Sequence, residues 1–294
     1  MATERCIFCG GQPTTKEHVF SRWTHKLLPQ RKPGRARSEI GLQYVDRLDP
    51  KIIKLPGQLR DWQVKCVCGG TNLSCNNGWM RSIENAAAPI LTDMILGKGR
   101  RLNLEDQERI ATWAILKAMV TSYDNRADVR IHHTQRRYIM THKTAPTNGW
   151  AVWIADFNRD KWIPEWVSRP MLLLPKSVAF RKKDFTATYF NANATTQIIG
   201  RAFIHVIHFP MPRFIRWWRF PIAYRGMLYK IWPPTQSSIK WPGPALDDTS
   251  ADALADAVFA HVRRVQQQLI TSAPDDIREK FLRIGSLAPK QRTR

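Results

Sequence analysis

The five cysteines of this 294-residue chain all lie before residue 76, and their grouping most strongly constrains how the chain can fold. Cys6 and Cys9 form a Cys-x-x-Cys pair followed by two glycines, and a second group, Cys66, Cys68 and Cys75, lies about 60 residues later. Two thiolates in a tight turn can bind one side of a tetrahedral zinc ion, and a second pair completes the site. We therefore expect a structural zinc ion that uses the first pair and two cysteines of the second group.

Two other interpretations of the cysteines are weaker. Free cysteines are often small buried residues, but Cys6 and Cys9 lie in a polar, glycine-rich segment with little apolar sequence to pack against. A thioredoxin-like redox pair follows a strand that starts a βαβ unit, and no strand is expected before Cys6. Five unevenly placed cysteines are also too few for a disulfide scaffold in a chain of this length.

The charge balance indicates a polyanionic partner. The chain has 46 Lys and Arg against 24 Asp and Glu, which gives a formal net charge of +22. Such an excess of one charge repels itself in the folded state and is typical of proteins that bind nucleic acid. The basic residues are spread over the whole chain and form no amphipathic stripe, which disfavours a membrane surface. DNA is the first expectation, and RNA remains an alternative.

Apolar residues make up 43% of the chain, which is enough for a sizeable core. A membrane helix needs about 20 consecutive apolar residues, and the best candidate, 110–120, contains Lys117. The first residues include no apolar segment of the kind found in a signal peptide. We expect a cytoplasmic protein without a membrane segment.

The composition and the spacing of apolar residues change near residues 98–101. We therefore divide the chain into domains 1–100 and 101–294. The second domain begins with a helix expected over 104–123, whose apolar residues recur at spacings of three and four. Helices flanking an antiparallel sheet would make this region α+β. The other expected elements are strands over 150–157, 185–191 and 197–209, and helices over 251–270 and 275–284.

An acidic residue stands beside a histidine between the two cysteine groups. Glu17 and His18 lie on a short apolar strand, where the carboxylate can bind a hard cation and the imidazole can accept a proton near neutral pH. After the second cysteine group, Asn76 and Asn77 begin a helix and offer amide oxygens for coordination.

These motifs together resemble the HNH endonucleases, the ββα-metal nucleases that contain a structural zinc ion. The residues that carry the resemblance are Cys6-x-x-Cys9, Glu17-His18-Val19 and Cys75-Asn-Asn-Gly-Trp-Met80, and it extends over residues 6–84. The last motif is typical of a bacterial and phage branch of the family. The resemblance implies an N-terminal zinc-stabilised ββα-metal nuclease domain, followed by a larger domain of helices and antiparallel sheet. It also implies metal-dependent hydrolysis of DNA.

The resemblance assigns a role to each matching residue. Glu17 matches the acidic residue that helps hold a catalytic Mg²⁺ or Mn²⁺, and His18 matches the general base that activates water. Asn76 matches the helix residue that completes the cation site, with Asn77 as the alternative one position later. The matching zinc ligands are Cys6, Cys9, Cys68 and Cys75.

The sequence departs from the family pattern in two places. Six residues separate Cys68 from Cys75 where the family usually has two, so Cys66 is the alternative third ligand. The central asparagine that orients the histidine in this family has no clear counterpart here. Asn72 and Gln63 are the candidates.

Basic residues near and beyond the motifs are candidates for nucleic-acid binding. Lys16 and Arg22 flank the Glu17-His18 pair. The segment 213–220 interleaves arginines with aromatic rings, a mixture that can cross phosphates and stack bases; its candidates are Arg213, Arg216, Trp217 and Arg219. An edge strand with outward-facing arginines explains the same segment equally well. His132 and His133, without a nearby carboxylate or cysteine, are interpreted as a solvated helix start.

Two functions follow from these observations. The first is a metal-dependent DNA endonuclease in which the larger domain holds DNA, forms a homo-oligomer or binds a protein partner. The second is a non-catalytic zinc-finger regulator that binds nucleic acid, with His18 in a structural role. Phage packaging, homing and antiphage defence are equally compatible with the nuclease.

Overall fold

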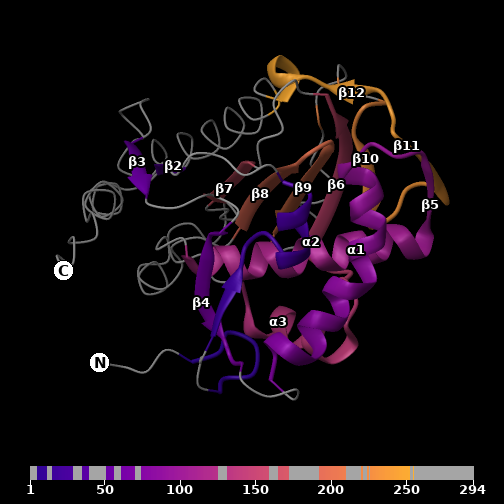
Figure 1. Cartoon of the computed structure of the whole chain (residues 1–294). Helices are drawn as coiled ribbons and strands as arrows, with labels where there is room; N and C mark the ends of the chain where they lie inside the picture. The colour runs from indigo at the N-terminus through magenta and orange to yellow at the C-terminus, as the bar shows by residue number, and fades with distance from the viewer. Residues whose placement is uncertain are drawn as a thin grey trace, which may run out of the picture.

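The computed structural model of the chain has a mixed α+β fold with antiparallel sheets, as the sequence predicts (Figure 1). It describes residues 5–11, 15–28, 35–39, 51–55, 61–69, 74–124, 131–158, 165–171, 192–209, 220, 224, 226–251 and 254. Most of the buried apolar residues form one cluster, which runs from Cys6 to Trp241.

A six-stranded sheet forms the largest layer. Both central strands, β6 (Trp150–Phe157) and β9 (Ala202–His208), are buried along their whole length. Successive side chains of a strand point to opposite faces, so this burial means that both faces of the sheet are covered. The antiparallel order is β10 (Tyr229–Trp232), β6, β9, β8 (Ala192–Ile199) and β7 (Glu165–Met171), and β12 (Ala245–Leu246) pairs with β6 in parallel.

The prediction of a single strand over residues 197–209 is wrong. The segment contains the end of β8 and the whole of β9, which form a hairpin with a turn at Gly200 and Arg201. Gly200 has a φ of 54°, a conformation that glycine adopts without steric cost. The end of β8 (Ile198 and Ile199) and the start of β9 (Ala202 to Ile204) are apolar, so the two strands look like one continuous run that hides the turn.

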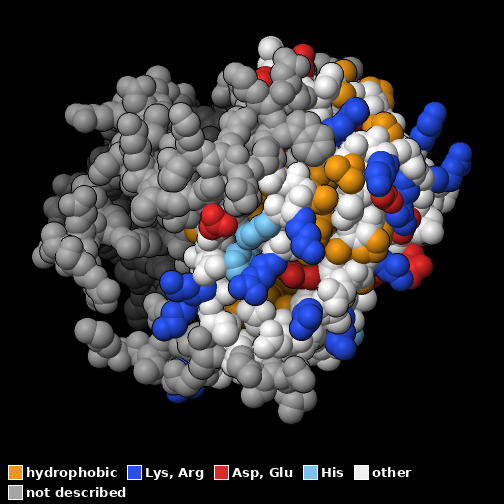
Figure 2. All heavy atoms as spheres, in the orientation of Figure 1, with side chains coloured by type: hydrophobic (Ala, Val, Ile, Leu, Met, Phe, Trp, Pro, Cys, Tyr) orange, Lys and Arg blue, Asp and Glu red, His pale blue; other side chains and the backbone are white. Residues whose placement is uncertain are grey.

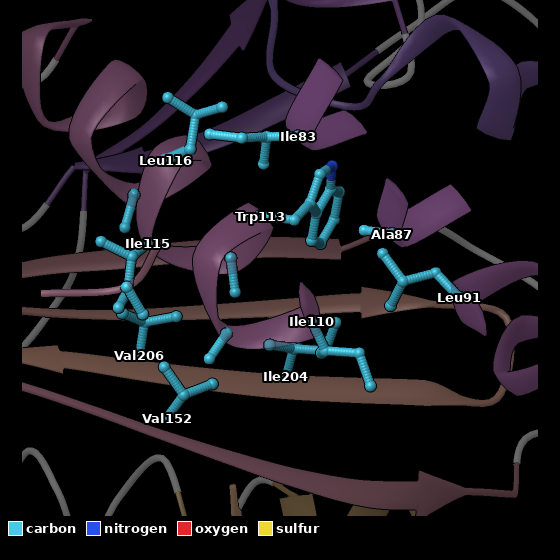
Figure 3. Packing of buried hydrophobic residues seen from close by; sticks show 14 of the residues in the cluster. Ile83, Ala87, Leu91, Ile110, Trp113, Ile115, Leu116, Val152, Ile204 and Val206 are labelled. Atoms are coloured by element: carbon cyan, nitrogen blue, oxygen red, sulfur yellow. The ribbon is translucent and has the colours of Figure 1, made fainter. Parts of the chain in front are cut away.

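Helix α2 (Leu104–Asp124), the helix expected over 104–123, lies between the sheet and helix α1 (Arg81–Ile95). Figure 3 shows Trp113 of α2 pointing towards Ala87 of α1. On the other side of α2, Ile110 and Ile115 lie towards the strand residues Ile204 and Val206. Every residue of 110–122 is buried. A polar side chain in this stretch therefore needs a partner inside the protein, because burying an unpaired polar group is costly.

The N-terminal part of the chain contributes a hairpin and a helix. Strand β1 (Thr15–His18) pairs antiparallel with β4 (Gln63–Val67), and the short helix η1 (Arg22–Lys26) follows β1. A wide helical turn, η4 (Asn76–Met80), leads directly into α1. The part of the sequence that connects β1 to β4 contains strands β2 (Arg35–Glu39) and β3 (Lys51–Leu55), which pair with each other.

The expected boundary near residue 100 falls on strand β5 (Arg100–Asn103). This strand pairs with β11 (Ser238–Trp241), from much later in the chain. The main core cluster contains residues from both sides of the boundary. The division into 1–100 and 101–294 stays a prediction, and the packing joins the two parts closely.

Helix α3 (His133–His142) begins where the sequence predicts a solvated helix start. The exposed His132 is its N-cap residue, and its Nδ1 accepts a hydrogen bond from Thr134 N. The helix expected over 251–270 is described only at its beginning, where Asp247 Oδ1 accepts from Ser250 N at 2.7 Å. The strand expected over 185–191 and the helix expected over 275–284 lie outside the described residues.

Two buried histidines of β9 should make the fold sensitive to acid. Burial lowers the pKa of both His205 and His208 to about 3. An unfolded chain binds these protons below pH 6.5, so the free energy of unfolding should fall as the pH drops from 6.5 towards 3. At pH 5 the loss should be about 2 kcal/mol per histidine.

We therefore expect the variant His205→Asn/His208→Gln to lose about 4 kcal/mol less stability than the wild type between pH 7.5 and 5. Urea unfolding at the two pH values measures this, and contributions shared by both proteins cancel in the comparison. An equal loss in both proteins would contradict the assignment.

Candidate metal centre and active site

Four cysteine thiols converge at the N-terminal end of the structure. The sulfur atoms of Cys6, Cys9, Cys68 and Cys75 all lie within 4.8 Å of one another. Cys6 Sγ is 3.8 Å from Cys75 Sγ, and Cys9 Sγ is 3.5 Å from Cys68 Sγ. Tetrahedral zinc with Zn–S bonds of about 2.3 Å places its sulfurs about 3.8 Å apart. The four thiols are therefore spaced to bind one zinc ion.

The backbone around the cysteines supports this arrangement. Gly10, with a φ of 76°, closes a turn in which its own N–H donates to Cys6 O. The N–H of Gly11 donates to Cys9 Sγ, and the N–H of Cys75 donates to Cys68 Sγ. Such bonds orient metal ligands and stabilise their negative charge.

Cys66 does not join this group. Its side chain is fully buried, and burial raises the pKa of its thiol, so it behaves as a packing residue. Cys68, the residue directly after β4, lies with the other three thiols instead. The expected set of Cys6, Cys9, Cys68 and Cys75 is the set that the fold brings together.

The zinc assignment predicts different outcomes for neighbouring cysteines. Cys9→Ala and Cys68→Ser should each lose the zinc, about one ion per chain, together with thermal stability, because metal binding and folding of such a small unit are coupled. Cys66→Ala is the matched control and should keep its zinc. Metal content by mass spectrometry and thermal unfolding test this, and a stable Cys9→Ala protein that retains zinc would refute the site.

His18 lies at the other end of strand β1, half-buried, opposite Gln63. Gln63 Nε2 is 2.6 Å from His18 Nε2. Burial lowers the pKa of His18 to about 4, and nearby positive groups add to the shift. The imidazole is therefore neutral at physiological pH. Of the two candidates for the residue that orients the histidine, Gln63 makes the contact, and Asn72 lies outside the described residues.

A second histidine, which sequence reasoning did not single out, packs against the first. The ring of His25 in η1 meets the His18 ring edge-on, with 5.4 Å between the centroids. His25 Nε2 is 3.3 Å from Phe20 O, and Nδ1 is 4.0 Å from Asp61. The ring of His25 therefore packs against one side of the His18 ring.

Glu17 points to the opposite face of β1 and is buried. Its carboxylate accepts a hydrogen bond of 2.6 Å from Lys117 Nζ of α2. Glu84 of α1 lies 2.5 Å from the same nitrogen and accepts a hydrogen bond from Ser21 Oγ. The two carboxylates raise the pKa of Lys117 despite its burial, so the ammonium ion stays charged.

Lys117, Glu84 and Ser21 were not identified as site residues from the sequence. The sequence does contain an indication for Lys117, because this lysine interrupts the otherwise apolar segment 110–120.

Asn76 lies at the zinc end of β1. Its side-chain Nδ2 donates to Thr15 Oγ1 at 3.3 Å, and Thr15 pairs with Val67, next to the ligand Cys68. Asn77 is exposed. Glu84 lies in α1, beyond the kink at Gly78 of η4, and it shares Lys117 Nζ with the main-chain oxygen of His18, which places it at the His18 end of β1. The structure thus groups Glu17, His18 and Glu84, and places Asn76 and Asn77 nearer the thiols.

A divalent cation has some suitable ligands here. Glu17 and Glu84 each have one carboxylate oxygen that makes no hydrogen bond to another described residue, and so does the amide oxygen of Asn76. Mg²⁺ is usually held by one or two carboxylates together with waters and substrate phosphate. Among the described residues, only the four thiols form a group of three or more possible metal ligands, so a cation at the His18 end would depend on the two carboxylates together with water and substrate phosphate.

Basic side chains border the site. Figure 2 shows Lys and Arg side chains gathered around exposed histidine surface on one face of the molecule. Lys16 and Arg22 are both exposed, and the positive charge of Arg22 is close enough to His18 to help lower its pKa. Arg213, Arg216, Trp217 and Arg219 lie outside the described residues, so their predicted role has no structural description.

Comparisons of the chain with protein-family models, with curated proteins and with solved structures found no match. Among the described residues, no helix combines the length and the apolar character needed to cross a bilayer.

Proposed function

We propose that this protein is a metal-dependent endonuclease that hydrolyses phosphodiester bonds in DNA, with His18 as the general base. The observation that carries the proposal is the neutral, half-buried His18, which is held by Gln63 and lies beside a buried carboxylate pair on a strand bordered by basic residues. A hydrolase needs a proton acceptor, a negative site for a cation and positive charge for the phosphate, and this region contains all three.

The architecture of the N-terminal part also supports this function. Two antiparallel strands, β1 and β4, are followed by a helix, α1, and four thiols lie at one end of the hairpin. This order is the one that the resemblance to ββα-metal nucleases implies. A zinc ion at the thiols would hold together a hairpin and helix that are too small for a core of their own.

The side chains divide the chemical work. His18 must accept a proton from water through a free imidazole nitrogen. In the structure the amide nitrogen of Gln63 faces Nε2, which places the ring proton on Nδ1. If the Gln63 amide rotates by 180°, its oxygen faces the imidazole instead. The ring proton then lies on Nε2, and Nδ1 is free to accept a proton.

Glu17 would hold a divalent cation, with Asn76 as the amide ligand expected from the sequence and Glu84 as the carboxylate nearer to His18. Such a cation, when bound, stabilises the charge that develops on the phosphate and on the leaving oxygen.

Removal of His18 should separate cleavage from binding. The His18→Ala protein should keep its zinc and its DNA affinity but cleave at least about 100-fold more slowly, because a positioned base contributes that much. His133→Ala, a change at an exposed histidine of α3, is the matched control and should cleave at the wild-type rate. Plasmid nicking with Mg²⁺ or Mn²⁺ measures both. Binding without cleavage by the wild type would favour the zinc-finger regulator.

The basic border of the site should contribute phosphate contacts. Each phosphate neutralised adds about 0.9 to the slope of log affinity against log salt concentration. The Lys16→Ala/Arg22→Ala variant should therefore bind duplex DNA with a slope reduced by about one to two. Lys98→Ala/Lys240→Ala removes two exposed charges elsewhere and should leave the slope unchanged. Fluorescence anisotropy over a salt series distinguishes these outcomes, and equal slopes in both variants would exclude contacts at the border.

A further inference from the structure

We infer that Lys117 is a positioning residue of the candidate nuclease centre, which holds the carboxylate, the histidine strand and helix α1 in place with one buried ammonium ion. The inference rests on the proposed function for its catalytic consequence. It assigns to the expected second domain, residues 101–294, a part in the centre itself, in addition to any part in holding DNA.

The ammonium ion makes three short contacts. Lys117 Nζ lies 2.6 Å from Glu17 Oε1, 2.5 Å from Glu84 Oε1 and 2.8 Å from the main-chain oxygen of His18. An ammonium group has three N–H donors and no acceptor, so these contacts use its full capacity. One atom of α2 thereby fixes β1 and α1 relative to each other.

The contacts act on both faces of β1. The Glu17 side chain lies on the inner face, and the bond to the His18 carbonyl holds the backbone from which the imidazole projects outward. A second link from α2 supports the same frame. Trp113 Nε1 donates to Ser21 Oγ at 3.0 Å, and Ser21 Oγ donates to Glu84 Oε1 at 2.6 Å. Movement of Lys117 would therefore displace the Glu17 carboxylate and the His18 imidazole together.

Stability does not explain why a lysine occupies this position. Lys117 is fully buried, and the side chains of Glu17 and Glu84 are only 8% and 20% exposed. Replacing a buried ion network by apolar residues of similar size is often neutral or stabilising, since charges lose their hydration on burial. Replacing Lys117 alone would instead leave two buried carboxylates without their counter-charge. The charge is better explained by the groups that it positions.

Lys117 also limits how the carboxylates can bind a cation. Two carboxylates and one ammonium ion carry a formal net charge of −1, and one oxygen of Glu17 is already engaged. Removal of the ammonium ion would free that oxygen and take away a neighbouring positive charge. The site should then bind a divalent cation more tightly, but in a geometry that no longer matches His18.

The test compares Lys117→Met with Gln107→Met in the full-length, zinc-loaded protein. Gln107 is also a fully buried polar residue of α2, and its amide bonds the main-chain oxygens of Leu102 and Gln236, about 15 Å along the helix from Lys117. Mn²⁺ binding by electron paramagnetic resonance and cleavage of plasmid are measured for each protein. Binding of Mn²⁺ is a readout that does not depend on activity.

We expect Lys117→Met to bind Mn²⁺ at least about threefold more tightly, because a positive neighbour is gone. Its kcat at saturating Mn²⁺ should fall at least about tenfold, because the reacting groups are misplaced. Gln107→Met should stay within about twofold of the wild type in both quantities, even where it lowers the melting temperature. A loss of folded protein would lower both the Mn²⁺ binding and kcat, so it cannot explain tighter binding together with a lower kcat.

A second pair of variants keeps the test decisive if Lys117→Met does not fold. Lys117→Met/Glu84→Gln removes one charge of each sign and is compared with Glu84→Gln alone. A double variant at least about tenfold slower than Glu84→Gln supports the positioning role. Equal rates in the folded pair, or unchanged cation affinity and kcat in a folded Lys117→Met protein, would overturn it.

Failure of the proposed function has a different appearance. A wild type that binds Mn²⁺ but cleaves no nucleic acid would overturn the nuclease, while tighter Mn²⁺ binding by Lys117→Met would still support the role of Lys117. A wild type that neither binds Mn²⁺ nor cleaves would overturn both.

Discussion

A lysine ammonium ion that is removed from water must be paired, because the cost of its lost hydration exceeds any gain from packing its alkyl chain. Lys117 meets this requirement with Glu17, Glu84 and the carbonyl of His18. These partners come from β1 and α1, while the lysine comes from the helix that covers the sheet. The position of the candidate catalytic strand is therefore set by the core of the whole protein. A hairpin held only by its own hydrogen bonds could not reach this precision.

The thiols and the ammonium ion hold the two ends of the same short strand. At the Thr15 end, β4 leads into Cys68, and Cys75 is the N-cap residue of η4. At the His18 end, about 10 Å away at the rise of a β-strand, Lys117 makes its three bonds. A cluster of four thiols, spaced to bind zinc, thus lies at one end of the hairpin, and a buried ion network lies at the other. Asn76, next to Cys75, accordingly contacts Thr15, whereas Glu84, eight residues later, contacts Lys117 near Glu17 and His18.

The electrostatics of the site differ from those of the chain as a whole. The chain carries a formal charge of +22, yet its buried carboxylate cluster has a formal charge of −1 and its histidine is neutral. A basic surface draws a polyanion towards the protein, and a local negative cluster is needed to hold a cation against it. The exposed Lys16 and Arg22 lie between these two environments, next to the residues that the nuclease proposal requires.

The sequence by itself determined the local features: the Cys-x-x-Cys turn, the Glu-His strand, the helical segment that begins at Asn76, the helix α2 and the mixed α+β class. Each depends on residues close together in the chain, through spacing, turn chemistry or periodicity. It could not separate β8 from β9, because strands buried on both faces lose the alternation that marks their ends. Only the tertiary structure decided that Cys68 and not Cys66 joins the thiols, that Gln63 contacts His18, and that Glu84 lies nearer to it than Asn76 does. Lys117 is the clearest case, because a single lysine in an apolar helix reveals its role only when packing brings two carboxylates, 100 and 33 residues away in the chain, to the same nitrogen.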